Sequence, residues 1–479
     1  MIKILDGDCP DPAVFREGDT FYLTYSSGPY YPGLPICSST DLVNWKMETY
    51  AVKDFKGKEI WAPDFFKYKD NKYYIYFSGA GTNWVIWSEH IQGPWSEPID
   101  LKVGYIDPGH VTDEEGKRYL LLSGGHIVPL AADGLSVCGP VKKLLDPPAL
   151  PEELDFEGEF PEAPNVIRIG RYYYLSYADG GTSGPATSHM IMLARANDLW
   201  GPWEFAPSNP LICTRDRLEK WICKGHGHFV EDGNGGLWVI YHAYENGYMN
   251  RGRKLLLSPV EITEDGWFQV ADGSERELRM PVPCAENAER GAGTAVCSPL
   301  AWQRLRGKRW TDFAMEEGCM IWRERAAERD LRGGQIPTDA RISCQCGPAL
   351  LNTGDHSYEL EARIHVEGGM ETGLLAIYNE EIYNAASVDG KELKVYRLGR
   401  LLYRREFPEE MCWLRLRVRR HYLDFSFSRD GLAWEKVKVT IDLEPQNTNA
   451  YDGFLSVRPG VFARGGGQAS VSEIKYRKV

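Results

Sequence analysis

A block of two short strands occurs five times in the first part of this 479-residue chain and limits the folds available to it. Each copy starts with a Pro- or Gly-containing segment and continues as an alternating apolar stretch. A turn at charged residues or Gly follows, and the copy ends in a second apolar stretch, which in most copies is rich in aromatic residues. This pattern is typical of a β-hairpin, and no long segment of the region has helical periodicity. The chain is therefore predicted to be all-β.

The spacing of the copies predicts how the hairpins assemble. Steps of 51, 45, 56 and 63 residues separate the markers Pro12, Pro63, Pro108, Pro164 and Gly227. Such a repeat accommodates four short strands and their loops, and strand-only repeats of about 40–50 residues are typical of β-propellers. Residues 1–284 are thus predicted to form a five-bladed β-propeller. A large β-sandwich with coincidental hairpins is the alternative.

The sequence changes in character after Cys284. Residues 285–300 are mostly small and polar and contain Gly, as expected of a linker. Residues 301–479 contain alternating stretches that predict a second domain of the β-sandwich type. These stretches are residues 357–364, 373–378, 414–419 and 422–427. In 414–419, Arg alternates with Leu and Val, which indicates one solvated and one buried face rather than a polyanion site.

Composition narrows the set of partners. The net charge of −13 opposes the basic surface that phosphate backbones require, so we expect no nucleic acid partner. No stretch approaches the ~20 apolar residues of a membrane span, so we expect no membrane contact.

The eleven cysteines are scattered and lack CxxC pairs, which indicates reduced thiols. Asp11 lies too close to Met1 for a cleaved leader, and we expect a cytoplasmic protein. The sequence leaves the oligomeric state open, with a homo-oligomer allowed.

Acidic residues recur where the copies begin. Asp11 and Asp107 each precede a proline, and Glu162 lies two residues before Pro164. Because the innermost strands of a propeller line its central channel, residues at matching repeat positions converge in space. Clustered carboxylates raise the pKa of at least one member, which provides an acid and a base near neutrality. Two such groups can hydrolyse a glycosidic bond in a small oligosaccharide substrate.

Aromatic residues lie near the same strand ends. Trp61 directly precedes Ala62-Pro63, and Tyr30-Tyr31 follow the first hairpin. Such rings are candidates for the apolar walls against which sugars pack, so Trp61 and Tyr31 are candidate substrate-binding residues. Packing in the core would explain either residue equally well.

Taken together, these segments resemble glycoside hydrolase family 43. The resemblance rests on Pro10–Pro12, Tyr31–Ile36, Ser39–Trp45, Trp61–Pro63, Ile106–Pro108, Glu162–Pro164, Gly225–Gly227 and Arg251–Pro259. They match the family pattern in order across the first domain. The resemblance implies a five-bladed propeller that hydrolyses with inversion. It also implies Asp11 as general base, Glu162 as general acid, and Asp107 as the group that orients the acid and tunes its pKa.

The resemblance implies further roles around these carboxylates. His226 would face a central metal ion, usually calcium in the family, and would contact substrate, although His is an uncommon calcium ligand unless it acts through water. Arg253 resembles an arginine that contacts the sugar and the base, with Arg251 as competitor for this role. Ala163 stands where the family usually has Gly after the acid, which leaves Glu159 as a second candidate acid.

The second domain resembles the concanavalin-like sandwich of the β-xylosidase branch, through residues 354–358 and 371–375. In that branch a loop of the sandwich helps close the active site, which favours removal of terminal sugars. We therefore expect an inverting exo-glycosidase without an organic cofactor. It would release terminal β-D-xylose or α-L-arabinofuranose from short hemicellulose-derived oligosaccharides. A non-catalytic carbohydrate-binding propeller, or a family 43 enzyme of other specificity such as an arabinanase or galactanase, is the alternative.

Overall fold

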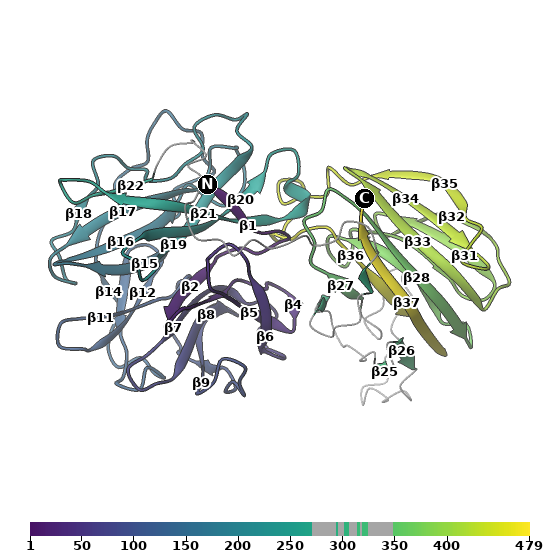
Figure 1. The fold of residues 1–479 in the computed structure, drawn as a ribbon, viewed down its shortest axis with the longest axis horizontal. Coiled ribbons are helices and arrows are strands. Elements are labelled where there is room, and N and C mark those ends of the chain that lie inside the picture. Colours follow the sequence, from purple (N-terminus) through teal and green to yellow (C-terminus); the bar gives the residue numbers. More distant parts are fainter. Residues whose placement is uncertain (271–293, 296–300, 306–313, 317–318, 324–347) are drawn as a thin grey trace. The chain divides into compact units, whose positions relative to one another are not determined.

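The computed structural model shows a chain built from β-strands (Figure 1). It describes residues 1–270, 294–295, 301–305, 314–316, 319–323 and 348–479. The helical element described in full is one 3₁₀ turn, Met249–Arg251. No helix among the described residues is long and apolar enough to cross a membrane.

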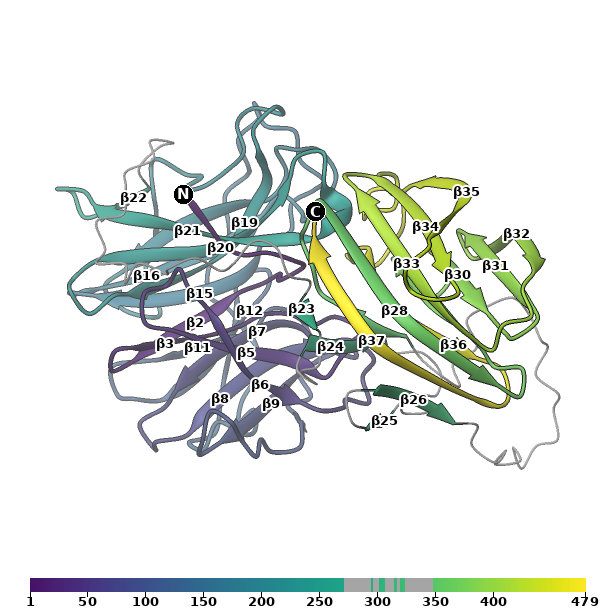
Figure 2. The ribbon, with the colours of Figure 1, turned by 45° about the vertical axis from the view of Figure 1, so that its right-hand side comes forward.

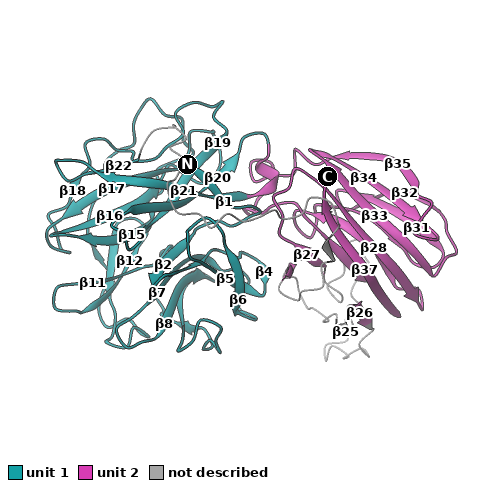
Figure 3. Ribbon diagram, viewed as in Figure 1, with its two compact units in different colours: residues 1–247, 253–284 teal, residues 248–252, 285–479 magenta. Residues whose placement is uncertain are grey.

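The chain divides into two compact units (Figure 3). The first comprises Met1–Gly247 and Arg253–Cys284, and the second comprises Tyr248–Gly252 and Ala285–Val479. A short segment before Arg253 therefore belongs to the second unit, which the sequence did not predict. The predicted linker, residues 285–300, lies almost entirely outside the described residues.

The first unit contains five antiparallel sheets, one for each copy of the repeat. Blade 1 contains β2 (Ala13–Glu17), β3 (Thr20–Thr24), β5 (Gly33–Ser39) and β6 (Lys46–Val52), with β4 (Tyr30–Tyr31) in the connection between β3 and β5. Blade 2 contains β7 (Trp61–Lys67), β8 (Tyr73–Gly79), β9 (Thr82–Ser88) and β10 (Ile99–Asp100). Blade 3 contains β11 (Gly109–Thr112), β12 (Arg118–Leu122), β13 (His126–Pro129) and β14 (Lys142–Lys143).

The remaining two blades follow the same order from the inside outward. Blade 4 contains β15 (Glu162–Ile169), β16 (Tyr172–Asp179), β17 (Met190–Ala196) and β18 (Glu204–Phe205). Blade 5 contains β19 (Trp221–Glu231), β20 (Leu237–Glu245), β21 (Arg253–Ile262), β22 (Phe268–Val270) and the N-terminal β1 (Ile2–Leu5). The first strand of each blade lies next to the axis, and β2 contacts both β7 and β19. The predicted five-bladed propeller is confirmed.

The N-terminal strand closes the ring. β1 pairs antiparallel with β21, and Ile2 lies opposite Leu257. Ile4 is buried in a cluster with Val14 of blade 1 and Ile240 of blade 5, so apolar packing joins the first and last blades. The segment that leads from β1 to Asp11 is therefore anchored at both ends.

The second unit is a β-sandwich, as predicted (Figure 2). One sheet has the order β25 (Ala314–Glu316), β26 (Cys319–Arg323), β37 (Gln468–Lys478), β28 (Ser357–Glu367), β33 (Met411–Arg419), β34 (Tyr422–Ser428) and β35 (Glu435–Asp442), with β23 (Thr294–Ala295) on β37. The other includes β32 (Arg400–Glu406), β31 (Glu392–Arg397), β30 (Tyr383–Val388), β29 (Glu371–Ile377), β36 (Arg458–Arg464), β27 (Ala349–Leu351) and β24 (Trp302–Leu305).

Strand β33 has the two faces that its sequence predicts. Leu414, Leu416 and Val418 are buried in the core. On the other face, Arg415 pairs with Glu361 at 2.8 Å and Arg419 with Asp424 at 2.7 Å. These arginines are neutralised by acidic neighbours, which is consistent with a solvated strand face. All cysteines in the described part of the chain are free thiols.

Candidate active site

One unusual backbone conformation occurs at the same place in all five blades. The residues with positive φ are Asp11 (56°), Ala62 (44°), Asp107 (57°), Ala163 (54°) and His226 (53°). Each directly precedes the Pro or Gly that marks its repeat. For a residue with a Cβ this conformation costs about 1–2 kcal/mol, and such strain is concentrated at functional sites. The repeat thus places one strained residue from every blade at one level of the propeller axis. Ala62, Ala163 and His226 lie at bulges in β7, β15 and β19, and the five positions together are called the strained turns below.

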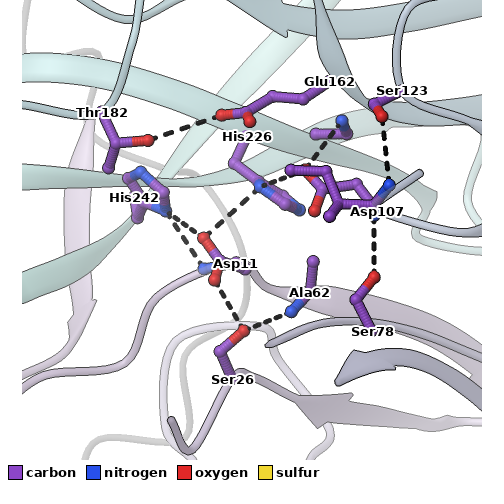
Figure 4. A network of polar contacts seen from close by, with 12 residues as sticks. Asp11, Ser26, Ala62, Ser78, Asp107, Ser123, Glu162, Thr182, His226 and His242 are labelled. Atoms are coloured by element: carbon purple, nitrogen blue, oxygen red, sulfur yellow. Dashed lines mark hydrogen bonds and ion pairs between the residues drawn. The ribbon is translucent and has the colours of Figure 1, made fainter. Parts of the chain in front are cut away.

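The backbone N–H groups at four of these turns are bound by side chains of the preceding blade. Asp11 donates to His242 Nδ1 (3.0 Å), Ala62 to Ser26 Oγ, Asp107 to Ser78 Oγ (2.9 Å) and Ala163 to Asp107 Oδ2 (3.0 Å). Figure 4 shows these contacts as one network around His226. Because four of the five turns are each bound by the preceding blade, this series of hydrogen bonds holds the turns of blades 1 to 4 in register around the axis.

A small cavity on the axis confirms that the five repeats converge. Its lining comes from all five inner strands or the turns before them: Pro12, Ala62, Pro63, Asp64, Asp107, Pro108, Ala163, Pro164, Asn165, His226, Gly227 and His228. Asp107 and His226, from blades 3 and 5, therefore face one space although they are distant in sequence.

Asp11 is buried and held in its ionised form by its neighbours. Its Oδ1 accepts from Arg253 Nη1 at 3.2 Å, and its Oδ2 accepts from Ser26 Oγ at 2.6 Å. Burial alone would raise the pKa of Asp11, but the charge of Arg253 and the contacts with His226 and His242 hold this pKa well below its ordinary value. Asp11 is therefore a carboxylate at neutral pH.

Asp107 and Glu162 have the opposite tendency. Burial, together with the negative charge of Asp11, raises the pKa of Asp107 to about 8. Burial and the nearby Asp107 and Asp11 raise the pKa of Glu162 well above its ordinary value. Thr182 Oγ1 donates to Glu162 Oε1 at 3.4 Å. Glu162 therefore retains a proton at a pH where Asp11 has lost its own, so the site contains an acid and a base together.

His226 lies between the carboxylates. Its Nδ1 is 3.4 Å from Asp11 Oδ1 and 4.0 Å from Asp107 Oδ2. Burial lowers the pKa of His226 to about 3, so its imidazole is neutral near pH 7. A neutral ring at this position separates Asp11 from Asp107 without supplying a charge of its own.

Comparison with models of known protein families shows the family to which the chain belongs. The model of the glycosyl hydrolases family 43 matches residues 2–268, more than half of the chain. The chain belongs to this family.

Individual relatives agree with the family assignment. The β-xylosidase of Bacillus subtilis is 29% identical over 92% of this chain and 91% of that protein. The non-reducing end α-L-arabinofuranosidase BoGH43B of Bacteroides ovatus is 31% identical over 57% of this chain and 54% of that protein, so this chain spans about half the length of that relative. The solved GH43 BlXynB protein of Bacillus licheniformis superposes with a TM-score of 0.83 at 25% identity, covering 99% of both chains.

In this family 43 chain the two candidate arginines occupy different environments. Arg253 is buried beside Asp11. Arg251 belongs to the second unit, where its Nη2 donates to the carbonyl oxygen of Arg420 at 2.9 Å and its guanidinium lies over Tyr358. Of the two, the geometry therefore places Arg253 with the carboxylates.

The two predicted aromatic residues also differ in position. Trp61 directly precedes the turn at Ala62, at the repeat position that Glu162 has in blade 4, and it is half-buried. Tyr31 is buried in the apolar cluster between blades 1 and 2, and its hydroxyl donates to the carbonyl oxygen of Lys58. Sugar binding by either residue stays a prediction. Glu159, the second candidate acid, is exposed.

Sequence reasoning missed four polar residues of the network. Ser26, Ser78 and His242 each lie at or near the end of the second strand of their blade, 15 or 16 residues after the strained turn. A column of polar residues at this spacing was a signal that could have revealed them. Thr182 lies in a loop beyond β16, and the repeat offers no equivalent signal for it.

The predicted calcium ion can be tested against the donor set. Among the described residues, Asp11, His226 and His242 have ligand atoms close enough to share an ion. Calcium prefers about 6–8 oxygen ligands, whereas this group offers one carboxylate and two imidazoles. Both carboxylate oxygens of Asp11 already accept hydrogen bonds. Direct binding of calcium by this set does not fit, and calcium held through water stays a prediction that elemental analysis of the purified protein tests.

Proposed function

We propose that this chain is an exo-acting glycoside hydrolase that releases terminal β-D-xylose or α-L-arabinofuranose from short oligosaccharides. The observation that carries the proposal is the convergence of Asp11, Asp107 and the residue after Glu162 on the propeller axis, where Asp11 and Glu162 have opposite pKa shifts. A glycosidase needs such a pair, because one group must take a proton while the other gives one. The names of the B. subtilis and B. ovatus relatives supply the two sugars.

In the proposed reaction Asp11 is the general base. Its ionised carboxylate accepts a proton from the water that attacks the anomeric carbon, and Arg253 and Ser26 fix its orientation. Glu162 is the general acid and donates its proton to the glycosidic oxygen as the bond breaks. Asp107 accepts the N–H of Ala163, which follows the acid, and once Asp107 is ionised, above about pH 8, its charge opposes loss of the Glu162 proton. Direct attack by water gives inversion of the anomeric configuration.

The substrate assignment is tested with 4-nitrophenyl β-D-xylopyranoside, 4-nitrophenyl α-L-arabinofuranoside, xylobiose, linear arabinan and galactan. We expect release from at least one of the two nitrophenyl pentosides, and monosaccharide as the first product from xylobiose. Hydrolysis of arabinan or galactan alone would instead favour a family enzyme of other specificity. Sugar binding without hydrolysis of any substrate would favour a non-catalytic propeller.

Stereochemistry requires a separate measurement. Proton NMR during the first minutes of hydrolysis identifies the anomer that forms first. We expect α-xylose from a β-xyloside, and β-xylose as the first product would contradict the role of Asp11 as base. Location in the cytoplasm, which would restrict the enzyme to short imported oligosaccharides, is part of the same proposal. Greater activity on insoluble xylan than on xylobiose would argue against it.

A further inference from the structure

A buried histidine outside the proposed catalytic set has no evident structural reason. His189 directly precedes β17, is 0% exposed and has a φ of 58°. Neither of its ring nitrogens has a hydrogen-bond partner among the described residues. A buried unpaired polar group and a left-handed residue with a Cβ each destabilise the folded chain. An aliphatic residue would avoid the first of these costs, so the imidazole needs an explanation.

The His189 ring packs on two paired residues of blade 5. It stacks on His242, with ring centroids 5.0 Å apart and planes inclined by 12°. It also lies against Gly225, the cross-strand partner of His242, where an added Cβ would be 1.9 Å from His189 Cδ2. Gly225 is therefore required by the position of this ring.

Both neighbours of His189 lead directly to Asp11. His242 Nδ1 accepts the backbone N–H of Asp11 at 3.0 Å. Gly225 directly precedes His226, whose Nδ1 is 3.4 Å from Asp11 Oδ1. A shift of His189 would free both the ring plane of His242 and the strand that carries His226.

We propose that His189 is a positioning residue for the catalytic base Asp11, acting through His242 and through the Gly225–His226 backbone. The inference rests on the proposed function, since it assigns His189 to the base of that reaction. Because Nδ1 of His242 accepts from Asp11, the proton of the neutral imidazole is on Nε2. Stacking against His189 fixes the plane of this ring, and within that plane the hydrogen bond from the N–H of Asp11 selects Nδ1 as the atom that faces it.

The test compares His189→Ala with Met192→Ala, a control on β17, the strand that follows His189. Met192 is buried in an apolar cluster, and its truncation removes a side chain of comparable size without touching His242 or Gly225. With 4-nitrophenyl β-D-xyloside, or the pentoside that the wild type hydrolyses, we expect His189→Ala to lower kcat about 10-fold or more. KM should stay within about two-fold, because Asp11 acts on water and not on sugar affinity. Met192→Ala should lower Tm but keep kcat within about two-fold of the wild type.

A double-mutant cycle keeps the proposal falsifiable. Gly225→Ala alone should lower kcat, because its Cβ displaces the His189 ring. In the His189→Ala background that space is vacant, so Gly225→Ala should cost markedly less. A His189→Ala variant that is folded and retains kcat within two-fold would overturn the proposal, as would additive losses in the cycle. If the wild type hydrolyses no glycoside, the proposed function itself fails. The same cycle measured by Tm then still reports the packing of His189 on Gly225.

Discussion

At the scale of single residues, Asp11 and Glu162 lie close enough for their charges to interact but have opposite pKa shifts because their neighbours differ. Asp11 has the guanidinium of Arg253 on one oxygen and the hydroxyl of Ser26 on the other. For Glu162, burial and two neighbouring carboxylates outweigh the attraction of Arg253. The site thus uses one arginine, placed closer to Asp11, to decide which carboxyl group is ionised.

This asymmetry predicts how loss of each group depends on the leaving group. Asp11→Asn should lower kcat by about 10³-fold or more on every substrate, because each reaction needs an activated water. Glu162→Gln should lower kcat/KM on xylobiose by about 10²–10⁴-fold yet spare β-D-xylosyl fluoride, whose leaving group needs no proton. Initial rates on both substrates check this. Glu159→Gln is the matched control and should have the activity of the wild type on both substrates. If Glu159→Gln instead lost activity on xylobiose but not on the fluoride, Glu159 and not Glu162 would be the general acid.

The third carboxylate predicts a change in pH dependence. kcat/KM requires Asp11 ionised and Glu162 protonated, so activity falls on the alkaline side as Glu162 loses its proton. Above about pH 8 Asp107 is ionised, and its negative charge then raises the pKa of Glu162; Asp107→Asn removes this charge. The alkaline limb should therefore move to lower pH by about one unit, with a larger loss of kcat/KM at pH 8 than at pH 6. The acid limb should move little, because Arg253 still stabilises the ionised Asp11. An alkaline limb that stays in place or moves to higher pH would contradict this role.

At the scale of secondary-structure elements, the strained turns explain why Ala163 is tolerated where the family usually has Gly. Its φ of 54° is readily adopted by Gly and, at a cost, by Ala, whereas a β-branched residue is strongly disfavoured there. Its N–H also donates to Asp107 Oδ2 at 3.0 Å. The turn after the acid therefore joins blades 3 and 4 through one residue.

The strain predicts a graded series at this position. Ala163→Gly should keep kcat within about two-fold and Tm within a few degrees, since relief of strain offsets the added freedom of the unfolded chain. Ala163→Val should lower kcat by about 10-fold or more and also lower Tm, because the turn must move and release Asp107. Steady-state kinetics and thermal melting of both variants test this. A Val variant with normal kcat would mean that this turn does not control the geometry of Asp107.

At the scale of the whole molecule, the sequence predicted the architecture better than the site. The five repeated hairpins predicted the propeller, and the alternating residues of β33 predicted the sandwich. Both could be predicted because buried apolar residues recur at a regular spacing along each strand. The positive φ of Asp11 and its four equivalents was not predicted, because it arises only when five turns pack around one axis. His189 was missed for the same reason, since its contacts with His242 and Gly225 join strands of different blades. No feature of the sequence predicted that the segment Tyr248–Gly252 belongs to the second unit.

The N-terminal strand β1 closes the propeller by joining its first and last blades. We therefore expect substitutions in β1 to lower both the stability of the protein and its activity. Beyond β1, Arg253 N–H donates to Asp8 Oδ1 at 3.0 Å and Cys9 N–H to the carbonyl oxygen of Arg253 at 2.9 Å. The strand that closes the ring therefore also holds the segment leading to Asp11 against its arginine partner.

Ile4→Ala should lower Tm by about 5 °C or more, because it removes a buried side chain between the first and last blades. It should also lower kcat several-fold at temperatures well below Tm, since loosening β1 frees Asp11. Ile262→Ala, at an exposed end of β21, is the control and should change neither value. Equal effects of the two substitutions on Tm, or a normal kcat for Ile4→Ala after the expected loss of stability, would show that closure of the ring and placement of the base are independent.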